Sequence, residues 1–302
     1  MYKYIFGPIQ SRRFGLSLGI DLSPEHKSCN FDCLYCELKP AKVTDSITNP
    51  PLVTSVISEV KEALQEYQNI DVITITANGE PTLYPYLDTL VDELNNIKKD
   101  KKLLILSNAS TISDIKIQEI IKKIDIVKLS LDCATAKCFK KIDRPIQNIS
   151  IENIINSLIT FRNKFHNTLI LEILVVLGVN DKTEEFKALK KVLDKINPDR
   201  IDLGTIDRPP AYDVKGVSIE KLKELREYLG KHNVSIIHKE KPKSRVDFSR
   251  EEILSTIKRR PQSEADIEYL FSKKSKENLI SLEKDKKITQ KNIAGVIFYT
   301  LL

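Results

Sequence analysis

The stretch DVITITANGEP, residues 71–81, holds the pattern that decides the fold. Residues 71–77 form a continuous run rich in β-branched side chains, which is typical of a strand buried on both faces of a parallel sheet. The turn that follows, residues 78–81, is polar and contains a glycine. A buried strand that ends in a polar turn is the repeating unit of an α/β barrel, where chemistry gathers at the carboxyl ends of the strands.

The same unit recurs along the first 240 residues. Short apolar runs alternate with longer segments whose apolar residues recur at helical spacing. The expected strands are residues 14–22, 71–77, 103–106, 126–131, 169–176, 200–204 and 234–238, and the expected helices are residues 55–67, 87–97, 114–123, 151–165, 184–196 and 219–231. This alternation predicts an α/β fold, a complete or partial (β/α)6 barrel of the TIM type.

The chain changes character after residue 240. We expect a barrel domain at residues 1–240, a polar linker at residues 241–248 and a small domain at residues 249–302. Three short helices are predicted in the small domain, with N-caps at Ser249, Ser263 and Ser275, followed by a hairpin that ends in VIFYTL. Three helices and a hairpin in so short a segment resemble a winged helix.

Composition restricts the class of protein. The 302 residues are 41% hydrophobic and 30% charged, which allows a large core and excludes a disordered or fibrous chain. No apolar run reaches the roughly 18 residues of a membrane helix. The first ten residues lack the apolar segment of an export signal. We therefore expect a cytoplasmic protein with no membrane contact.

The net charge of +6 is unevenly distributed. Residues 241–302 contain 14 Lys and Arg against 9 Asp and Glu, so they carry +5 of it. A basic domain favours nucleic acid or an acidic protein as its partner. A solvated helical surface in a lysine-rich protein explains the same charge equally well.

Three of the five cysteines lie close together, at Cys29, Cys33 and Cys36. Thiolates are soft ligands that suit iron–sulfur clusters or zinc. Three cysteines on a [4Fe–4S] cluster leave one iron open to a small molecule, whereas His26 together with the three would make a Cys3His zinc site. The odd number of cysteines and the missing export signal argue against a disulfide framework.

This C-x3-C-x2-C triad, with the aromatic Tyr35 before its last cysteine, resembles the signature of the radical S-adenosylmethionine (SAM) superfamily. The resemblance covers residues 1 to 240. It implies that Cys29, Cys33 and Cys36 hold a [4Fe–4S] cluster whose fourth iron binds SAM, and that Tyr35 packs against the cluster or the adenine. An electron from a flavodoxin- or ferredoxin-type donor would cleave SAM, and the resulting 5′-deoxyadenosyl radical would abstract a hydrogen atom from the substrate. No catalytic side chain is assigned.

The resemblance also assigns SAM contacts after successive strands. Asn78-Gly79-Glu80 is similar to the family's glycine–glycine–glutamate motif, with Asn78 in place of the first glycine, and Glu80 with the neighbouring backbone would bind the SAM amino group. Ser107 and Asn108 resemble a ribose-binding pair, Ser130 a SAM-contacting serine, and Asn180 part of a Gly-x-Asn-Asp turn that supports SAM. Taken alone, the first motif is an ordinary turn and Ser130 a helix cap.

Several short motifs are similar to the wyosine-forming, tRNA-modifying subgroup of this superfamily. They are residues 6–8, 11–13, 19–21, 79–82 and 142–145. No cysteine precedes Cys29, so the second cluster of that enzyme is not expected. The basic C-terminal lysines suggest tRNA as the substrate: Lys273, Lys274, Lys276, Lys284, Lys286 and Lys287. A winged helix that only docks a protein partner or stabilises the barrel explains the same segment equally well.

Some residues and roles stay open. Cys133 and Cys138 are expected as buried structural cysteines. Glu172 lies mid-strand and needs a partner if it points into the barrel; the candidates are Arg12, Arg13 and Arg144. Residues 205–210 form either a substrate rim or a plain loop. The alternative functions are an activase for a protein glycyl radical and a non-enzymatic winged-helix regulator that senses zinc or redox state.

Overall fold

The computed structural model describes residues 2–11, 13–206, 208, 210–236, 245–259, 261–293 and 296–302. Eight strands form one sheet in sequence order. They are β1 (Ile5–Ser11), β2 (Gly15–Asp21), β3 (Val72–Thr76), β4 (Lys102–Ser107), β5 (Ile126–Ser130), β6 (Thr168–Val175), β7 (Arg200–Thr205) and β8 (Val234–Ile236). β1 and β2 are antiparallel, and every later pair is parallel. The predicted parallel α/β barrel sheet is confirmed.

The barrel is open. Within the described residues no backbone ladder joins β8 to β1, so these two strands are the edges of the sheet. Arg13, in the β1–β2 turn, crosses this gap and donates to the backbone oxygen and the hydroxyl of Ser235 on β8, at 3.0 and 3.1 Å. The last expected strand, residues 234–238, is seen to residue 236, and the rest lies outside the described residues.

β1 was not expected from the sequence. Its Gly7-Pro8 pair breaks the apolar run, and the ladder to β2 shifts register between Phe6 and Ile9. Proline donates no hydrogen bond to a ladder, but an edge strand with a bulge accommodates it. The segment therefore extends the sheet despite its turn-like sequence.

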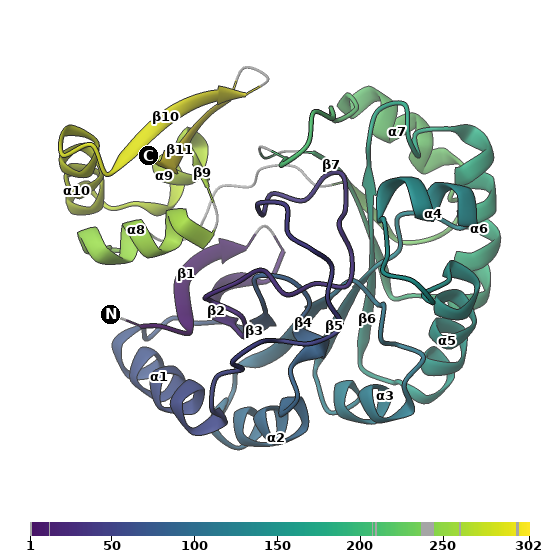
Figure 1. Ribbon diagram of the computed structural model, residues 1–302, viewed down its shortest axis with the longest axis horizontal. Coiled ribbons are helices and arrows are strands. Elements are labelled where there is room, and N and C mark those ends of the chain that lie inside the picture. Colours follow the sequence, from purple (N-terminus) through teal and green to yellow (C-terminus); the bar gives the residue numbers. More distant parts are fainter. Residues whose placement is uncertain are drawn as a thin grey trace.

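Seven helices lie along the outer side of the sheet (Figure 1). They are α1 (Val53–Glu66), α2 (Leu87–Ile97), α3 (Ile115–Ile121), α4 (Ala136–Ile142), α5 (Ile151–Lys164), α6 (Thr183–Ile196) and α7 (Ile219–Glu227), with a 3-10 turn η1 (Pro81–Leu83) after β3. The longer helices match the predicted ones within a few residues. α4 was not predicted from the sequence. None of the helices in the described ranges is long and apolar enough to cross a membrane.

In the C-terminal domain, the residues that the structure describes form three helices and a three-stranded sheet. Its elements are α8 (Arg250–Arg259), β9 (Gln262–Ser263), α9 (Glu264–Leu270), α10 (Lys273–Lys284), β10 (Ile288–Ile293) and β11 (Val296–Leu301), and the sheet order is β10-β11-β9. The predicted three helices and hairpin are present. The assignment of this domain to the winged-helix fold stays a prediction. The structure describes residues 245–248 of the expected linker. The Val246 amide donates a hydrogen bond to the Leu270 backbone oxygen of the domain at 2.7 Å.

One predicted cap is wrong. Ser272, not Ser275, caps α10. Ser275 lies inside the helix and is fully buried, where its hydroxyl accepts from the Phe248 amide and donates to the Val246 carbonyl. The capping box at Ser263 and Asp266 and the bond from the Glu252 amide to the Ser249 hydroxyl agree with the other two predicted caps.

Candidate functional site

A cavity of about 560 Å³ lies on the inner face of the sheet. Alternate residues of neighbouring strands line it, because successive side chains of a strand point to opposite faces. From β2 to β7 these are Ser17, Gly19, Thr74, Thr76, Leu104, Leu106, Lys128, Glu172, Leu174, Asp202 and Gly204. Tyr35 and Cys36 from the β2–α1 loop, and Asn78 after β3, line the same cavity. The loop of the cysteine triad therefore reaches the space enclosed by the strands through Tyr35 and Cys36.

The loop that carries the triad, residues 29–36, is held from several sides. The Asp32 and Leu34 amides donate to the backbone oxygens of Asp143 and Ile142, at the end of α4, over 3.1 and 2.8 Å. The Asp32 carboxylate accepts from Arg144 at 2.6 Å and from the Tyr212 hydroxyl at 2.8 Å. These bonds fix the loop backbone, so the three sulfur atoms are presented by a rigid segment.

The three thiols are free cysteines in half-buried positions. Burial raises the pKa of Cys29 to about 12 and holds the pKa of Cys33 well above its usual range. Bound iron cations would offset this cost, because coordination deprotonates a thiol outright. Two donors already approach the sulfurs: Lys27 Nζ lies 3.4 Å from Cys36 Sγ and Asn108 Nδ2 lies 3.6 Å from Cys29 Sγ. This donor set fits a [4Fe–4S] cluster.

The geometry argues against a zinc ion on the same residues. Ligands of one tetrahedral zinc lie within about 4 Å of one another, since each Zn–S bond is about 2.3 Å. Across the described ranges, three ligand atoms within 4.8 Å occur at Cys133, Cys138 and Glu185, and His26 with the triad forms no such group. Ligands on separate irons of a cluster are not held to this short spacing.

Tyr35 is anchored by a carboxylate that the sequence did not single out. Its hydroxyl donates to Asp132 Oδ2 at 2.5 Å, and the Leu174 amide donates to Asp132 Oδ1 at 2.7 Å. Burial raises the pKa of Asp132 to about 7. The Asp143 carboxyl, 3.5 Å from Cys33 Sγ, also has a pKa raised by burial. Two buried acids, Asp132 after β5 and Asp143 after α4, therefore contact the triad loop. The position of Asp132 at a strand end was the signal available for it in the sequence.

Glu80 is 1% exposed, and both of its carboxylate oxygens accept hydrogen bonds from other groups of the protein. Its Oε1 accepts from the Thr82 amide and hydroxyl at 2.9 and 2.6 Å, and its Oε2 accepts from the Asn108 amide at 2.7 Å. Glu80 joins the turns after β3 and β4 and is not among the cavity-lining residues. Its neighbour Gly79 pairs with Ser28, just before the triad.

The other expected SAM contacts lie around the loop but not on the cavity wall. Asn108 donates to Asn30 Oδ1 at 3.0 Å, and the Ser107 hydroxyl accepts from the Ala109 amide. Asn180 is fully buried and donates to the backbone oxygens of Asp132 and Leu174. Ser130 ends β5 half-buried; Thr135, not Ser130, caps α4, so the helix-cap alternative for Ser130 is wrong.

A charged network covers one wall of the cavity. Lys128 lies 2.6 Å from Glu172 and 3.3 Å from the fully buried Asp202, which also accepts from Arg13 at 2.8 Å. The expectation that Glu172 points into the barrel is correct. Two of its candidate arginine partners are wrong, since Arg13 pairs with Asp202 and Arg144 pairs with Asp32. The third candidate, Arg12, lies outside the described residues. Alternation along β5 was the signal that could have identified Lys128.

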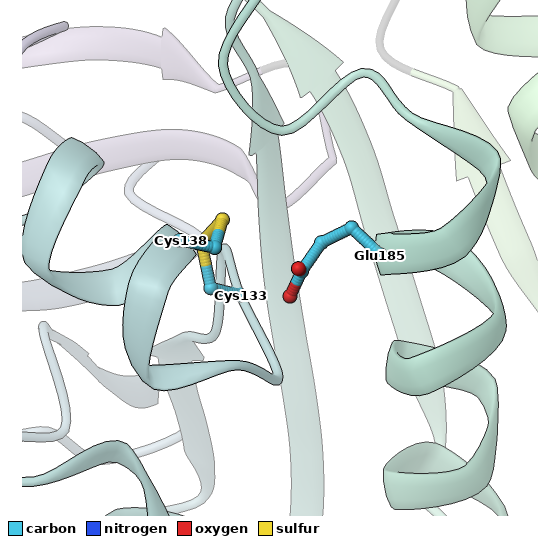
Figure 2. Close-up of side chains that lie close together, drawn as sticks. All are labelled: Cys133, Cys138 and Glu185. Atoms are coloured by element: carbon cyan, nitrogen blue, oxygen red, sulfur yellow. A yellow bond between two sulfur atoms is a disulfide. The ribbon is translucent and has the colours of Figure 1, made fainter.

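Cys133 and Cys138 form a disulfide, with their Cα atoms 5.7 Å apart. Figure 2 shows Glu185 of α6 facing them. The Glu185 carboxylate accepts from the Ala134 amide at 2.6 Å and from the Thr135 amide and hydroxyl at 3.0 and 2.7 Å. The odd number of cysteines predicted no disulfide, and for this pair the prediction is wrong. The two residues are separated by five positions at the start of α4, which brings their sulfur atoms together.

An open α/β barrel whose cavity is bordered by a three-cysteine loop defines an iron–sulfur barrel enzyme. The family model "Radical SAM superfamily" matches residues 26–189, more than half of the chain. The chain belongs to this superfamily and is an enzyme whose cofactors are a [4Fe–4S] cluster and SAM.

Relatives extend this similarity over nearly the whole chain. A UPF0026 protein of Helicobacter pylori strain J99 is 38% identical over 98% of this chain and 96% of its own length. The S-adenosyl-L-methionine-dependent tRNA 4-demethylwyosine synthase of Oryza sativa is 30% identical over 41% of this chain and 18% of its own. Among solved structures, Streptococcus suis SuiB bound to S-adenosylmethionine has a TM-score of 0.58 at 19% identity, covering 76% of this chain and 51% of SuiB. The last match shows the fold alone.

Proposed function

We propose that this enzyme modifies a nucleotide of tRNA, with Cys29, Cys33 and Cys36 as the ligands of its cluster. The observation that carries the proposal is the position of the triad loop, which contributes Tyr35 and Cys36 to the barrel cavity. With SAM bound, a cluster held by these cysteines would supply a 5′-deoxyadenosyl radical by reductive cleavage, and a flavodoxin- or ferredoxin-type protein in the cytoplasm is the proposed electron donor.

The chain's own residues bind and orient SAM and the substrate, and they exclude water from the cavity. Asn78 reaches the cavity while its amide is fixed by Asp21 at 2.8 Å, which supports the proposed role of the residues 78–80 turn in holding the SAM amino group. Glu80 acts as a positioning residue for this turn, since both its oxygens are occupied. Asn108 and Asn180 position the loops around the triad, and Ser107 and Ser130 remain proposed SAM contacts.

The residues that line the cavity suit a substrate that has both apolar and charged parts. Phe6, Ile9 and Phe14 from the first hairpin line it, and so does the Lys128–Glu172 pair of β5 and β6. Apolar walls exclude water and stray hydrogen donors from a reactive intermediate. The charged pair offers fixed groups for hydrogen bonds to a polar ring or side chain.

Two observations favour tRNA over a protein substrate. A tRNA-modifying synthase is among the relatives, and residues 241–302, the linker together with the C-terminal domain, carry +5 of the net charge. Phosphate contacts come mainly from such lysines and arginines. An activase for a glycyl radical would instead form a stable complex with its protein target.

Anaerobic reconstitution with iron and sulfide tests the proposal. We expect a brown protein with four irons, and 5′-deoxyadenosine on addition of SAM and dithionite. Cys29→Ala, Cys33→Ala and Cys36→Ala should each lose the cluster, whereas the matched variant Cys138→Ala should keep it. Incubation with total tRNA followed by nucleoside mass analysis should reveal a mass change. A cluster on Cys36→Ala would refute the ligand set, and a co-purifying protein target with unchanged tRNA would refute the substrate.

A further inference from the structure

The C-terminal domain is docked on the rim of the barrel. α8 packs beside β1 (Figure 1), and the Tyr67 hydroxyl on the barrel side donates to Glu252 on α8. Arg208, which follows β7, donates to the Pro261 backbone oxygen at 2.8 Å. The domain is therefore joined to the barrel by hydrogen bonds at two separate points, beside the edge strand β1 and beside the segment after β7.

Arg208 connects the domain to the cysteine loop. Its guanidinium is 9% exposed and lies 3.7 Å from Glu37, the residue after Cys36, and 3.8 Å from Asp266 of α9. Three residues further on, the Ala211 amide donates to the Cys36 backbone oxygen at 2.7 Å. Ala211 thus contacts the triad loop, and Arg208 contacts both Glu37 and the C-terminal domain, which fixes the domain close to the cluster ligands.

Docking places one cation of the domain at the cavity. Lys258, near the end of α8, lines the cavity together with Cys36, Glu37 and Arg208. It is exposed, and in the described part of the chain no salt bridge involves it. An ammonium group without a carboxylate partner is a ready donor of up to three hydrogen bonds to an anion.

We propose that the C-terminal domain forms part of the active site and that Lys258 binds a backbone phosphate of the RNA at the mouth of the cavity. This inference rests on the proposed function. An enzyme that acts on a base takes the nucleotide out of its stack into a pocket, so the flanking phosphates lie at the pocket mouth. Lys258 lines the cavity and is exposed, and its domain, residues 249–302, contains 11 Lys and Arg against 8 Asp and Glu. The carboxylate of SAM is the other anion of the site, and the experiment separates the two.

The test compares Lys258→Ala with Lys187→Ala, an exposed lysine on α6 outside the cavity lining. Binding of fluorescently labelled total tRNA to the reconstituted enzyme is followed by anisotropy at several salt concentrations, and SAM binding by equilibrium dialysis. Loss of one phosphate contact should weaken tRNA binding about three- to tenfold and lower the log–log salt slope by about 1. Lys187→Ala should change neither, and SAM affinity should stay constant in both variants.

Each other result overturns the inference. Equal tRNA affinity and salt slope for the two variants would place Lys258 away from the RNA. Weaker SAM binding with unchanged tRNA binding would assign Lys258 to the SAM carboxylate. If the unchanged enzyme binds no tRNA but still forms 5′-deoxyadenosine, the tRNA substrate itself is refuted and the phosphate contact with it. Because Lys258 is exposed, the thermal midpoint of its variant should match that of the unchanged enzyme.

Discussion

The hydroxyl of Tyr35 donates a hydrogen bond to Oδ2 of Asp132 over 2.5 Å and thereby joins the cysteine loop to the end of β5. Asp132 also accepts from the Leu174 amide of β6 at 2.7 Å. One buried carboxyl therefore fixes the aromatic residue of the triad against two strands. Because burial favours the neutral form of a carboxyl, this contact depends on pH.

We predict that stability falls as the pH rises through neutrality. Burial raises the pKa of Asp132 to about 7, so between pH 5 and 7 the folded protein binds a proton that the unfolded chain, with a carboxyl pKa of about 4, has lost. The stabilisation is complete below about pH 4 and is lost as the pH rises through about 7. Thermal unfolding of iron-free protein from pH 5 to 8 measures this. Other buried or charged groups add their own dependence, so the informative quantity is the difference between the protein and a variant.

Asp132→Asn is the matched variant, since its amide cannot ionise and can still accept from Leu174 and bond to Tyr35. In this variant the thermal stability should depend less on pH than in the unchanged protein. Some pH dependence should remain, because the pKa of Asp143 is also raised. An unchanged dependence in Asp132→Asn would show that Asp132 does not titrate in this range.

We predict that Glu80→Ala destabilises the fold strongly. The substitution leaves the Thr82 amide, the Thr82 hydroxyl and the Asn108 amide without their acceptor. A buried donor left without a partner costs about 1–3 kcal/mol, so the free energy of unfolding should fall by about 4 kcal/mol. Urea unfolding measures it. Glu93→Ala, at an exposed position of α2, should stay within about 0.5 kcal/mol of the unchanged protein; a similar small loss at Glu80 would refute the bonding role.

We predict that two glycines of positive φ respond differently to alanine. Gly79 has φ +139°, and a Cβ there would lie 1.8 Å from the Ser28 backbone oxygen, while Gly178 has φ +73° and no heavy atom within 4 Å of its Cβ position. Gly79→Ala should cost at least about 3 kcal/mol because clash adds to strain. Gly178→Ala should cost only about 1 kcal/mol of strain. Equal losses in urea unfolding would show that Gly79 does not approach Ser28 this closely.

The sequence predicted what depends on local pattern. The β-branched run of β3 and the C-x3-C-x2-C spacing are readable within a few residues, so the parallel sheet and the triad could be predicted. The Lys128–Glu172 and Tyr35–Asp132 pairs join residues 44 and 97 positions apart and depend on strand register and loop path. Glu80 shows the same limit: its place after a strand was readable, but the Asn108 amide that occupies its Oε2 comes from the turn after β4.

We predict that three thiols are free in the iron-free protein and two are paired. Alkylation under denaturing conditions should label three cysteines before reduction and five after it, because Cys133 and Cys138 form a disulfide. Closing this short loop restricts the unfolded chain, so Cys133→Ser and Cys138→Ser should each lower the free energy of unfolding by about 2 kcal/mol. Mass spectrometry and urea unfolding measure the two quantities.

The double variant Cys133→Ala/Cys138→Ala distinguishes the bond from a metal held by the two thiols and Glu185, whose ligand atoms lie within 4.8 Å of one another. If the disulfide is the stabilising element, reductant should lower the stability of the unchanged protein toward that of the double variant, and a chelator should have no effect. Five labelled thiols before reduction, together with sensitivity to the chelator, would replace the disulfide by a metal at this site. The Thr135 and Ala134 contacts of Glu185 favour the disulfide, since they already occupy both carboxylate oxygens.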